Sequence, residues 1–320
     1  MTQVTTIEPL AGAGERQGSD KSIIRRVGVI GLGNMGHALA VNLVEDGYQV
    51  LVFDRDRERA TSLRSTGDVV VAASLRNLAA CDVVVTSLPN DDALSVVALE
   101  PEGLLSVLAP GAVHVSTSTV SPSITRRIAE EHARHGQEFV AAPVLGNPDF
   151  ARTRKLFVLA GGPEPALEKV RPLLERLGQR LFVIGEDPAA ANLMKLASNV
   201  LTATTLECMG EVLALLRKGG VDRHLAFDVL TNSMFDSRVH KTYGGKIVEE
   251  RFGQPNFPAP LAMKDVRLAL AEAERLAVPM PAAALAHDHL VAMMARGWAD
   301  LDWSALGLLA AVDAGLSDNR

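Results

Sequence analysis

A glycine-rich turn between an apolar strand and a helix is the feature that most constrains how this chain folds. Val27–Ile30 forms one β-branched run, and Val50–Phe53 forms a second one further along. Between them, apolar residues recur at helical spacing after a turn made of Gly31, Leu32, Gly33, Asn34, Met35 and Gly36. This succession of strand, tight turn, helix and strand predicts a βαβ unit, whose two strands lie parallel in one sheet.

The three glycines of the turn have different physical tasks. Gly31 permits the tight turn, Gly33 lets the backbone approach a ligand closely, and Gly36 lets the helix pack against the strand. The turn opens a helix whose N-terminal N–H groups attract negative charge. The pattern therefore predicts a site for the pyrophosphate of a dinucleotide, and a purely structural glycine turn is the alternative.

Asp54 ends the second strand and bears on the choice between NAD and NADP. A carboxylate at this place accepts hydrogen bonds from the adenosine ribose and repels a 2′-phosphate, which favours NAD. Arg55 follows directly, and an arginine beside the ribose is a usual partner of a 2′-phosphate. We therefore expect NAD or NADP as the cofactor, with NAD favoured.

Strands and helices continue to alternate through the first part of the chain. Further strand-like runs lie at Val69–Val71, Val83–Val85, Val113–Val115, Phe139-Val140, Leu156–Ala160 and Leu181–Ile184. Helical segments separate most of these runs. This alternation predicts an α/β Rossmann domain with a doubly wound, mainly parallel sheet.

The character of the chain changes near Asp187, where strand-like runs stop. A long, mostly apolar helix is expected from Ala189 to Lys218, ended by Gly219-Gly220, and strong helical patterns follow at Met263–Leu276 and Ala282–Ala295. We expect an all-helical domain here, joined to the first domain by the long interdomain helix. Because that helix is apolar on nearly all faces, a partner subunit is expected to cover part of it, in a homo-oligomer of at least two chains.

These observations predict three regions. Residues 1–24 are polar and glycine-rich and are expected to form a flexible tail. Residues 25–187 are expected to bind the dinucleotide. Residues 188–320 are expected to contribute to the substrate site and to dimerisation.

Composition argues against several classes of function. The net charge is −6 with lysine and arginine dispersed, and 4% of the residues are aromatic, which argues against a nucleic-acid partner. No stretch approaches the roughly 18 uncharged apolar residues of a membrane span, and no targeting signal is evident. Cys81 and Cys208 lack metal-type spacing, so we expect no metal site and a reduced, cytoplasmic location.

Lys195 is the leading candidate for chemistry because it lies within the long apolar helix. Asn199 follows four residues later, so the two side chains lie on one helix face, about 6 Å apart. Burial lowers the pKa of a lysine toward the range that is useful for proton transfer. The alternative is a lysine whose ammonium reaches the surface while its stem packs against apolar neighbours.

Several motifs occur together in order: GLGNMG, SLPN, STSTVSP, APVLGNP, KLASN, FPAPLAMKD and DWSAL. In these motifs, from residue 26 to the C-terminal helices, the chain resembles the β-hydroxyacid dehydrogenase family, of the 3-hydroxyisobutyrate dehydrogenase type. The resemblance implies an NAD(P)-dependent oxidoreductase that transfers a hydride between nicotinamide and a small hydroxy acid or semialdehyde. It identifies Lys195 as the general acid/base and Asn199 as its companion.

The same resemblance implies where the substrate binds. Ser118 and Thr119 match the element whose serine helps to hold the substrate carboxylate. Gly146 falls in the substrate-binding turn, and Asn147 follows it. A simpler role for Ser118 is to cap the helix that follows.

Residues beside the cofactor are implied as well. Lys264 matches a lysine near nicotinamide and substrate, and Leu88 and Pro89 match a loop beside the nicotinamide ribose. Thr119 is expected to contact the cofactor too. For Lys264, the alternative is a surface ion pair with Asp265 that contributes little to stability.

The chain departs from the family pattern at several places. Leu145 and Asn147 stand where the family usually has serine and a second glycine, which makes the carboxylate end of the pocket bulkier and more apolar. Ser116 replaces an aspartate, and Ala189 and Ala191 replace glycines before the catalytic helix. The type of reaction is expected to survive these changes, whereas the usual substrate need not.

Two other functions compete with the dehydrogenase. An imine reductase would have the same architecture and reduce C=N bonds; Lys195 argues against it, and the altered turn around Gly146 argues mildly for it. A non-catalytic NAD(P)-binding module would bind cofactor without turnover, and the presence of both Lys195 and Asn199 argues against that.

Overall fold

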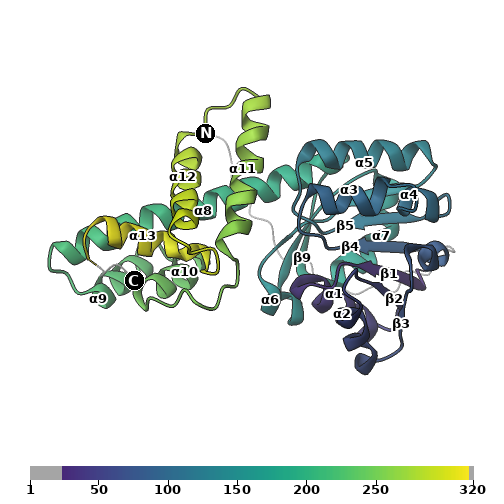
Figure 1. Cartoon of the computed structure of the whole chain (residues 1–320), viewed down its shortest axis with the longest axis horizontal. Helices are drawn as coiled ribbons and strands as arrows, with labels where there is room; N and C mark the ends of the chain where they lie inside the picture. The colour runs from purple at the N-terminus through teal and green to yellow at the C-terminus, as the bar shows by residue number, and fades with distance from the viewer. Residues whose placement is uncertain (1–23, 317–320) are drawn as a thin grey trace, which may run out of the picture.

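The computed structural model describes residues 24–316, so residues 1–23 of the expected tail lie outside the described part. Its N-terminal domain is built on a nine-stranded sheet in the order β3-β2-β1-β4-β5-β6-β8-β7, with β9 paired to β8 (Figure 1). The ladders are parallel except those that β6 and β7 form with β8. The doubly wound, mainly parallel sheet is thus confirmed. Its strands are β1 Arg26–Ile30, β2 Gln49–Phe53, β3 Val69–Val71, β4 Val83–Thr86, β5 Val113–Ser116, β6 Glu138–Ala141, β7 Val144–Leu145, β8 Leu156–Gly161 and β9 Gly178–Gly185.

Helices cover both faces of this sheet, because each strand sends alternate side chains to opposite sides. Val83 and Val85 of β4 belong to the core shared with α1 and α7, whereas Val84 belongs to a core on the opposite face. The helical segments of this domain are α1 Asn34–Glu45, α2 Arg57–Ser62, η1 Leu63–Thr66, η2 Leu75–Ala80, α3 Asp91–Leu99, α4 Leu104–Val107, α5 Pro122–Arg134, α6 Pro148–Arg152 and α7 Glu164–Arg176.

The long helix α8, Pro188–Lys218, leaves the sheet domain and becomes the axis of the second domain (Figure 1). Asp187 caps its start, since its carboxylate accepts a hydrogen bond from the N–H of Ala189 at 2.9 Å. Gly219 and Gly220 end the helix as expected, and Gly220 adopts φ +81°, which favours glycine.

The second domain is all-helical, as expected, and its helices pack around α8. Two glycines meet where α8 contacts α13, because a Cβ on Gly210 of α8 would come within 2.7 Å of the Cα of Gly307 of α13. The absence of side chains therefore lets these two helices touch at their backbones. The helices are α9 Arg223–Thr231, α10 Arg238–Val248, α11 Ala259–Arg275, α12 Pro281–Ala295, η3 Trp303–Ala305 and α13 Leu306–Asp313.

Among the described residues, α8 is the one helix long and apolar enough to cross a membrane. Half of its most apolar window is buried inside the protein, where it contacts β6, β8, α11 and α13. The core helix of a two-domain protein has the same length and composition.

Candidate functional site

The glycine turn between β1 and α1 forms an open cradle. Gly31 has φ +87°, and a Cβ there would lie 2.3 Å from the Ser87 carbonyl oxygen. A Cβ on Gly36 would lie 1.9 Å from the Gly31 carbonyl oxygen, whereas one on Gly33 would meet nothing within 4 Å. Gly33 is the N-cap residue of α1, and it has no side chain that could accept hydrogen bonds from the N–H groups that begin the helix. These groups and the space beside Gly33 fit the pyrophosphate of a dinucleotide.

Asp54 ties this turn to the end of β2. One carboxylate oxygen accepts from the N–H of Leu32 at 2.6 Å, and the other accepts from the N–H of Asp56 at 2.8 Å. Arg55 beside it is exposed and makes no ion pair with a described residue. The carboxylate thus shapes the turn, a role that the sequence did not indicate, and it remains close to the cradle.

Lys195 lies in a chain of buried polar groups between α8 and α11. Its ammonium donates to the Asn199 side-chain oxygen at 3.2 Å, and the Asn199 amide donates to Asp265 at 2.6 Å. The other oxygen of Asp265 lies 3.0 Å from the Lys264 ammonium. Lys195 is 9% exposed and Asp265 is 1% exposed. The arrangement contradicts both simpler alternatives, since Lys195 does not reach the surface and Lys264 pairs with a buried carboxylate while its own side chain is 15% exposed.

The surroundings of Lys195 weaken its hold on a proton. Burial is the largest influence and lowers the pKa of the ammonium from its ordinary value near 10.5. The charge of Asp265 raises this pKa, and the charge of Lys264 lowers it. Because no carboxylate bonds the Lys195 ammonium directly, the group is suited to exchange a proton with a ligand.

Lys264 connects two loops of the sheet domain to this series of buried polar groups. Its ammonium donates to the carbonyl oxygens of Pro89 at 3.0 Å and of Thr119 at 2.6 Å. The same two loops are joined by a bond from the N–H of Leu88 to the Ser118 hydroxyl oxygen, 2.9 Å long. The structure therefore brings Leu88, Pro89, Ser118, Thr119 and Lys264 together, at the boundary where α8 and α11 meet the sheet domain.

The helix-capping alternative for Ser118 is wrong. The side chain that caps α5 is that of Ser121, which accepts from the N–H of Ile124 at 3.1 Å. Ser118 is buried, and its hydroxyl hydrogen remains available after its oxygen has accepted from Leu88. A donor of this kind suits an anionic or carbonyl ligand.

Gly146 and Asn147 lie in the turn between β7 and α6. Gly146 has φ +132°, and a Cβ there would come within 2.8 Å of Leu156. The Asn147 side-chain oxygen accepts from the N–H of Phe150 at 3.0 Å and so caps α6. No described hydrogen bond or ion pair joins this turn to Lys195.

Asp265 is a candidate site residue that the sequence interpretation did not select. The sequence did offer a clue to Asp265, because this residue follows Lys264 directly in the motif FPAPLAMKD. What the sequence lacked was the packing of α11 against α8, which buries the carboxylate beside Asn199.

A buried hydrogen-bond chain supports the loop that carries Ser118. Gln137 donates both amide hydrogens to backbone carbonyls, at 3.1 and 2.7 Å, so its oxygen accepts from His132 Nδ1 at 2.7 Å. It follows that His132 Nε2 accepts from His114 Nδ1, and His114 Nε2 accepts from the Thr86 hydroxyl, each at 2.9 Å. The Thr86 carbonyl in turn accepts from the Thr117 N–H and hydroxyl. Both imidazoles must be neutral for this order of donors.

Stability is therefore expected to fall as the pH drops from 6.5 to 4. Burial lowers the pKa of His132 from 6.5 to about 4, and it lowers the pKa of His114 well below the same ordinary value. Between these pKa values the unfolded state binds more protons than the folded state, so acid favours unfolding. His132 alone is expected to lower the free energy of unfolding by about 3 kcal/mol. Urea unfolding across this pH range measures the loss. His132→Gln should flatten the slope, and exposed His224→Gln should not; parallel curves for all three proteins would contradict the expectation.

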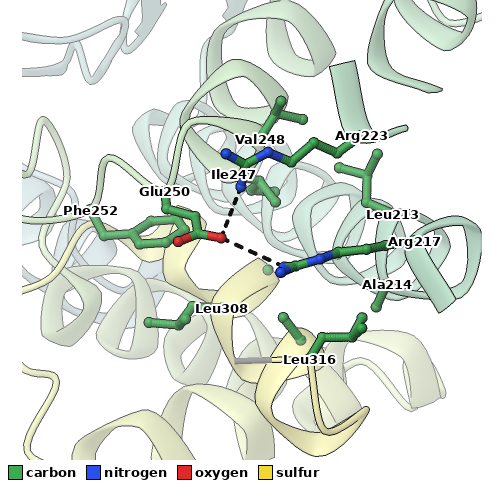
Figure 2. Close-up of a pocket in the computed structure, with 13 residues that line it drawn as sticks. Leu213, Ala214, Arg217, Arg223, Ile247, Val248, Glu250, Phe252, Leu308 and Leu316 are labelled. Carbon is green, nitrogen blue, oxygen red and sulfur yellow. Dashed lines mark hydrogen bonds and ion pairs between the residues drawn. The ribbon is translucent and has the colours of Figure 1, made fainter. Parts of the chain in front are cut away.

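A small cavity lies elsewhere, within the helical domain. It has a volume of about 40 Å³, is partly open, and is lined by residues of α8, α9, α10 and α13 and of the segments that follow α10 and α13 (Figure 2). Glu250 closes one side and binds Arg223 at 3.0 Å and Arg217 at 3.6 Å. None of the residues that the sequence selected lines this cavity.

No group of three or more histidine, cysteine or acidic residues that could hold a metal ion occurs in the part of the chain that the structure describes. The polar groups brought together around Lys195 are a second lysine, an amide, a single carboxylate that is paired with that lysine, hydroxyls and backbone carbonyls. This set matches proton transfer beside a dinucleotide better than metal binding.

Family models cover both domains. The NAD-binding domain of 6-phosphogluconate dehydrogenase matches residues 26–185, and the NAD-binding domain of NADP-dependent 3-hydroxyisobutyrate dehydrogenase matches residues 189–309. An uncharacterised oxidoreductase of Bacillus subtilis is 37% identical over 88% of this chain and 98% of its own. The 2-(hydroxymethyl)glutarate dehydrogenase of Eubacterium barkeri is 31% identical over 90% of this chain and 94% of its own.

Solved structures agree with these matches. Mycobacterium tuberculosis 3-hydroxyisobutyrate dehydrogenase, solved with L-serine, superposes with a TM-score of 0.81 at 26% identity and covers 90% of this chain and 99% of that one. Imine reductases superpose with TM-scores of 0.58 and 0.62 at 23% and 22% identity, which shows the fold alone. With a dinucleotide cradle, a buried lysine on the interdomain helix and matches along both domains, this chain belongs to the β-hydroxyacid dehydrogenase family of NAD(P)-dependent oxidoreductases.

Proposed function

We propose that this enzyme interconverts a small hydroxy acid and the corresponding semialdehyde, with Lys195 as general acid/base. The observation that carries the proposal is the chain from Lys195 through Asn199 to Asp265, which holds a buried ammonium with no directly bonded carboxylate. A lysine with a lowered pKa is suited to both directions of the reaction: its ammonium protonates the carbonyl oxygen during reduction, and its neutral amine accepts the hydroxyl proton during oxidation.

The roles of the surrounding residues follow from their contacts. Bound nicotinamide would supply the carbon that gives or takes the hydride. Asn199 orients the Lys195 ammonium, and Lys264 fixes the loops that carry Pro89 and Thr119. Ser118 offers its free hydroxyl hydrogen to the acidic end of the substrate.

The remaining assignments concern the pyrophosphate and adenosine ribose of the cofactor and the carboxylate of the substrate. Turn residues Gly31 to Gly36 would hold the pyrophosphate and Asp54 the adenosine ribose, which favours NAD over NADP. Gly146 and Asn147 would lie at the substrate carboxylate, together with Ser118.

An imine reductase is the second candidate, favoured by Leu145 and Asn147 in place of the usual serine and glycine. The buried Lys195 weighs against it, because reduction of an already protonated imine needs no ammonium donor. A non-catalytic NAD(P)-binding module ranks third, since it gives no reason to bury a lysine beside the cofactor loops.

A single assay tests these alternatives. NADH and NADPH oxidation should be followed with a panel of semialdehydes, neutral aldehydes and cyclic imines, and NAD⁺ reduction with small hydroxy acids. We expect turnover of semialdehydes with a higher kcat/KM for NADH than for NADPH. Turnover of imines alone would overturn the dehydrogenase, and cofactor binding without any turnover would support the module.

We also propose that residues 25–187 act as the cofactor unit and residues 188–320 as the substrate and dimerisation unit of a cytoplasmic homodimer. On the outer side of α8, Leu201 is 69% exposed and Leu215 is 71% exposed, and Cys208 lies between them. A second copy of the chain would cover this apolar stripe. Sedimentation velocity that returns a single monomeric species would contradict the dimer.

A further inference from the structure

Arg238 reaches from the helical domain to the sheet domain. It begins α10, and its guanidinium carbon lies 5.2 Å from the centre of the Phe150 ring and 5.7 Å from that of the Phe157 ring. Phe150 belongs to α6 and Phe157 to β8, so this contact spans the boundary between the domains. Figure 1 shows α6 on the side of the sheet domain that faces the helices.

The two rings under Arg238 frame the turn assigned to the substrate carboxylate. The Phe150 side chain packs on Gly146, where an added Cβ would lie 3.2 Å from the ring. Phe157 pairs with Leu145 across the β7–β8 ladder, directly before that glycine. Stacking on these rings therefore holds Arg238 beside the turn, and it leaves the edges of the guanidinium free to donate hydrogen bonds.

The charge of Arg238 is uncompensated within the described part of the chain. Arg238 forms no ion pair or hydrogen bond with a described residue, whereas Lys241 on the next turn of α10 pairs with Asp236 at 2.7 Å. The ammonium of Lys264 is already engaged by Asp265 and two backbone carbonyls. Arg238 is thus a cation beside the turn whose charge is free to meet an anion.

We propose that Arg238 binds the substrate carboxylate and determines the preference of the enzyme for charged over neutral aldehydes. This inference rests on the proposed function and names the group that recognises its substrate class. A guanidinium donates two parallel hydrogen bonds to a carboxylate, a geometry that a single hydroxyl does not provide. At Leu145 the chain lacks a side-chain donor, and Arg238 supplies a stronger one from the other domain.

The test compares two substrates that differ in one charge. Succinic semialdehyde and its methyl ester have the same aldehyde and the same carbon chain, and only the acid carries a charge. Arg238→Gln should lower kcat/KM for the acid by about 30-fold, mainly through KM, and change that for the ester by less than about twofold. Arg238→Lys should restore part of the loss. Arg180→Gln is the matched control, because Arg180 also stacks on a ring, that of Phe182 at 4.4 Å, on β9.

Binding of succinate to the cofactor-loaded protein, measured by calorimetry, separates this inference from the proposed reaction. If the protein bound succinate through Arg238 but reduced no aldehyde, the anion site would be supported and the proposed reaction would be wrong. The anion site would be overturned if Arg238→Gln lowered kcat/KM equally for acid and ester, or lowered it for neither. If turnover still depended on Lys195 in that case, the proposed reaction would be unaffected.

Discussion

Replacing Lys195 by methionine is expected to lower kcat by about 10³-fold while the cofactor dissociation constant changes by less than about twofold. Methionine fills nearly the same volume, so the packing of α8 is preserved and the loss reports on the missing ammonium. The cofactor cradle contributes separately, since no described hydrogen bond joins the Gly31–Gly36 turn to Lys195. Steady-state kinetics and fluorescence titration with NADH measure the two quantities.

The control for this change is Lys218→Met, which removes an exposed lysine from the other end of the same helix. Its kcat should match that of the wild type. In the wild type, kcat/KM should also depend on an ionisation below pH 10.5, because burial lowers the pKa of Lys195. A Lys195→Met enzyme within tenfold of the wild-type kcat would remove the general acid/base role.

Asp265→Asn is expected to lower kcat by about 10- to 100-fold and to shift the ionisation of Lys195 to still lower pH. The carboxylate is the charge that raises the pKa of Lys195, and it is the counter-charge of Lys264 at 3.0 Å. Asparagine keeps the shape and removes the charge, so two ammonium groups then face each other without compensation. The pH dependence of kcat/KM measures the shift.

Asp265 acts through Lys195 and Asn199, so it is a positioning residue, and the pH profile separates that role from a general loss of structure. A variant that merely folds less well would lower kcat without moving the ionisation. Asp288→Asn, on the exposed side of α12, should change neither quantity. An unchanged pH profile in Asp265→Asn would show that this carboxylate does not tune the lysine.

Much of the fold follows from local patterns in the chain. The strands of the parallel sheet are short β-branched runs, and α8 is bounded by Asp187-Pro188 and Gly219-Gly220, so their positions were predicted to within a few residues. Strand β7 was missed, because Val144–Leu145 is too short to show a period of two. Its antiparallel pairing with β8 comes from the chain reversal around Gly146, and that is a tertiary feature.

The candidate site likewise combines features that are local in the sequence with features that depend on tertiary packing. The spacing of Lys195 and Asn199 on one helix face is local, and their hydrogen bond follows from it. The partnership of Asn199 with Asp265 joins residues 66 positions apart and depends on how α11 crosses α8. The pairing of His114 with His132 likewise depends on the packing of α5 against the sheet. Such contacts have no signature in the order of residues.

Chemical rescue of Lys195→Ala by small amines tests most directly whether this lysine carries the proton. Methylamine brings both a charge and an exchangeable proton to the vacated space, whereas tetramethylammonium brings the charge alone. We expect methylamine to raise the rate of semialdehyde reduction in a saturable manner and tetramethylammonium to leave that rate unchanged. An equal response to both cations, or no response to methylamine in a variant that still binds NADH, would contradict this expectation.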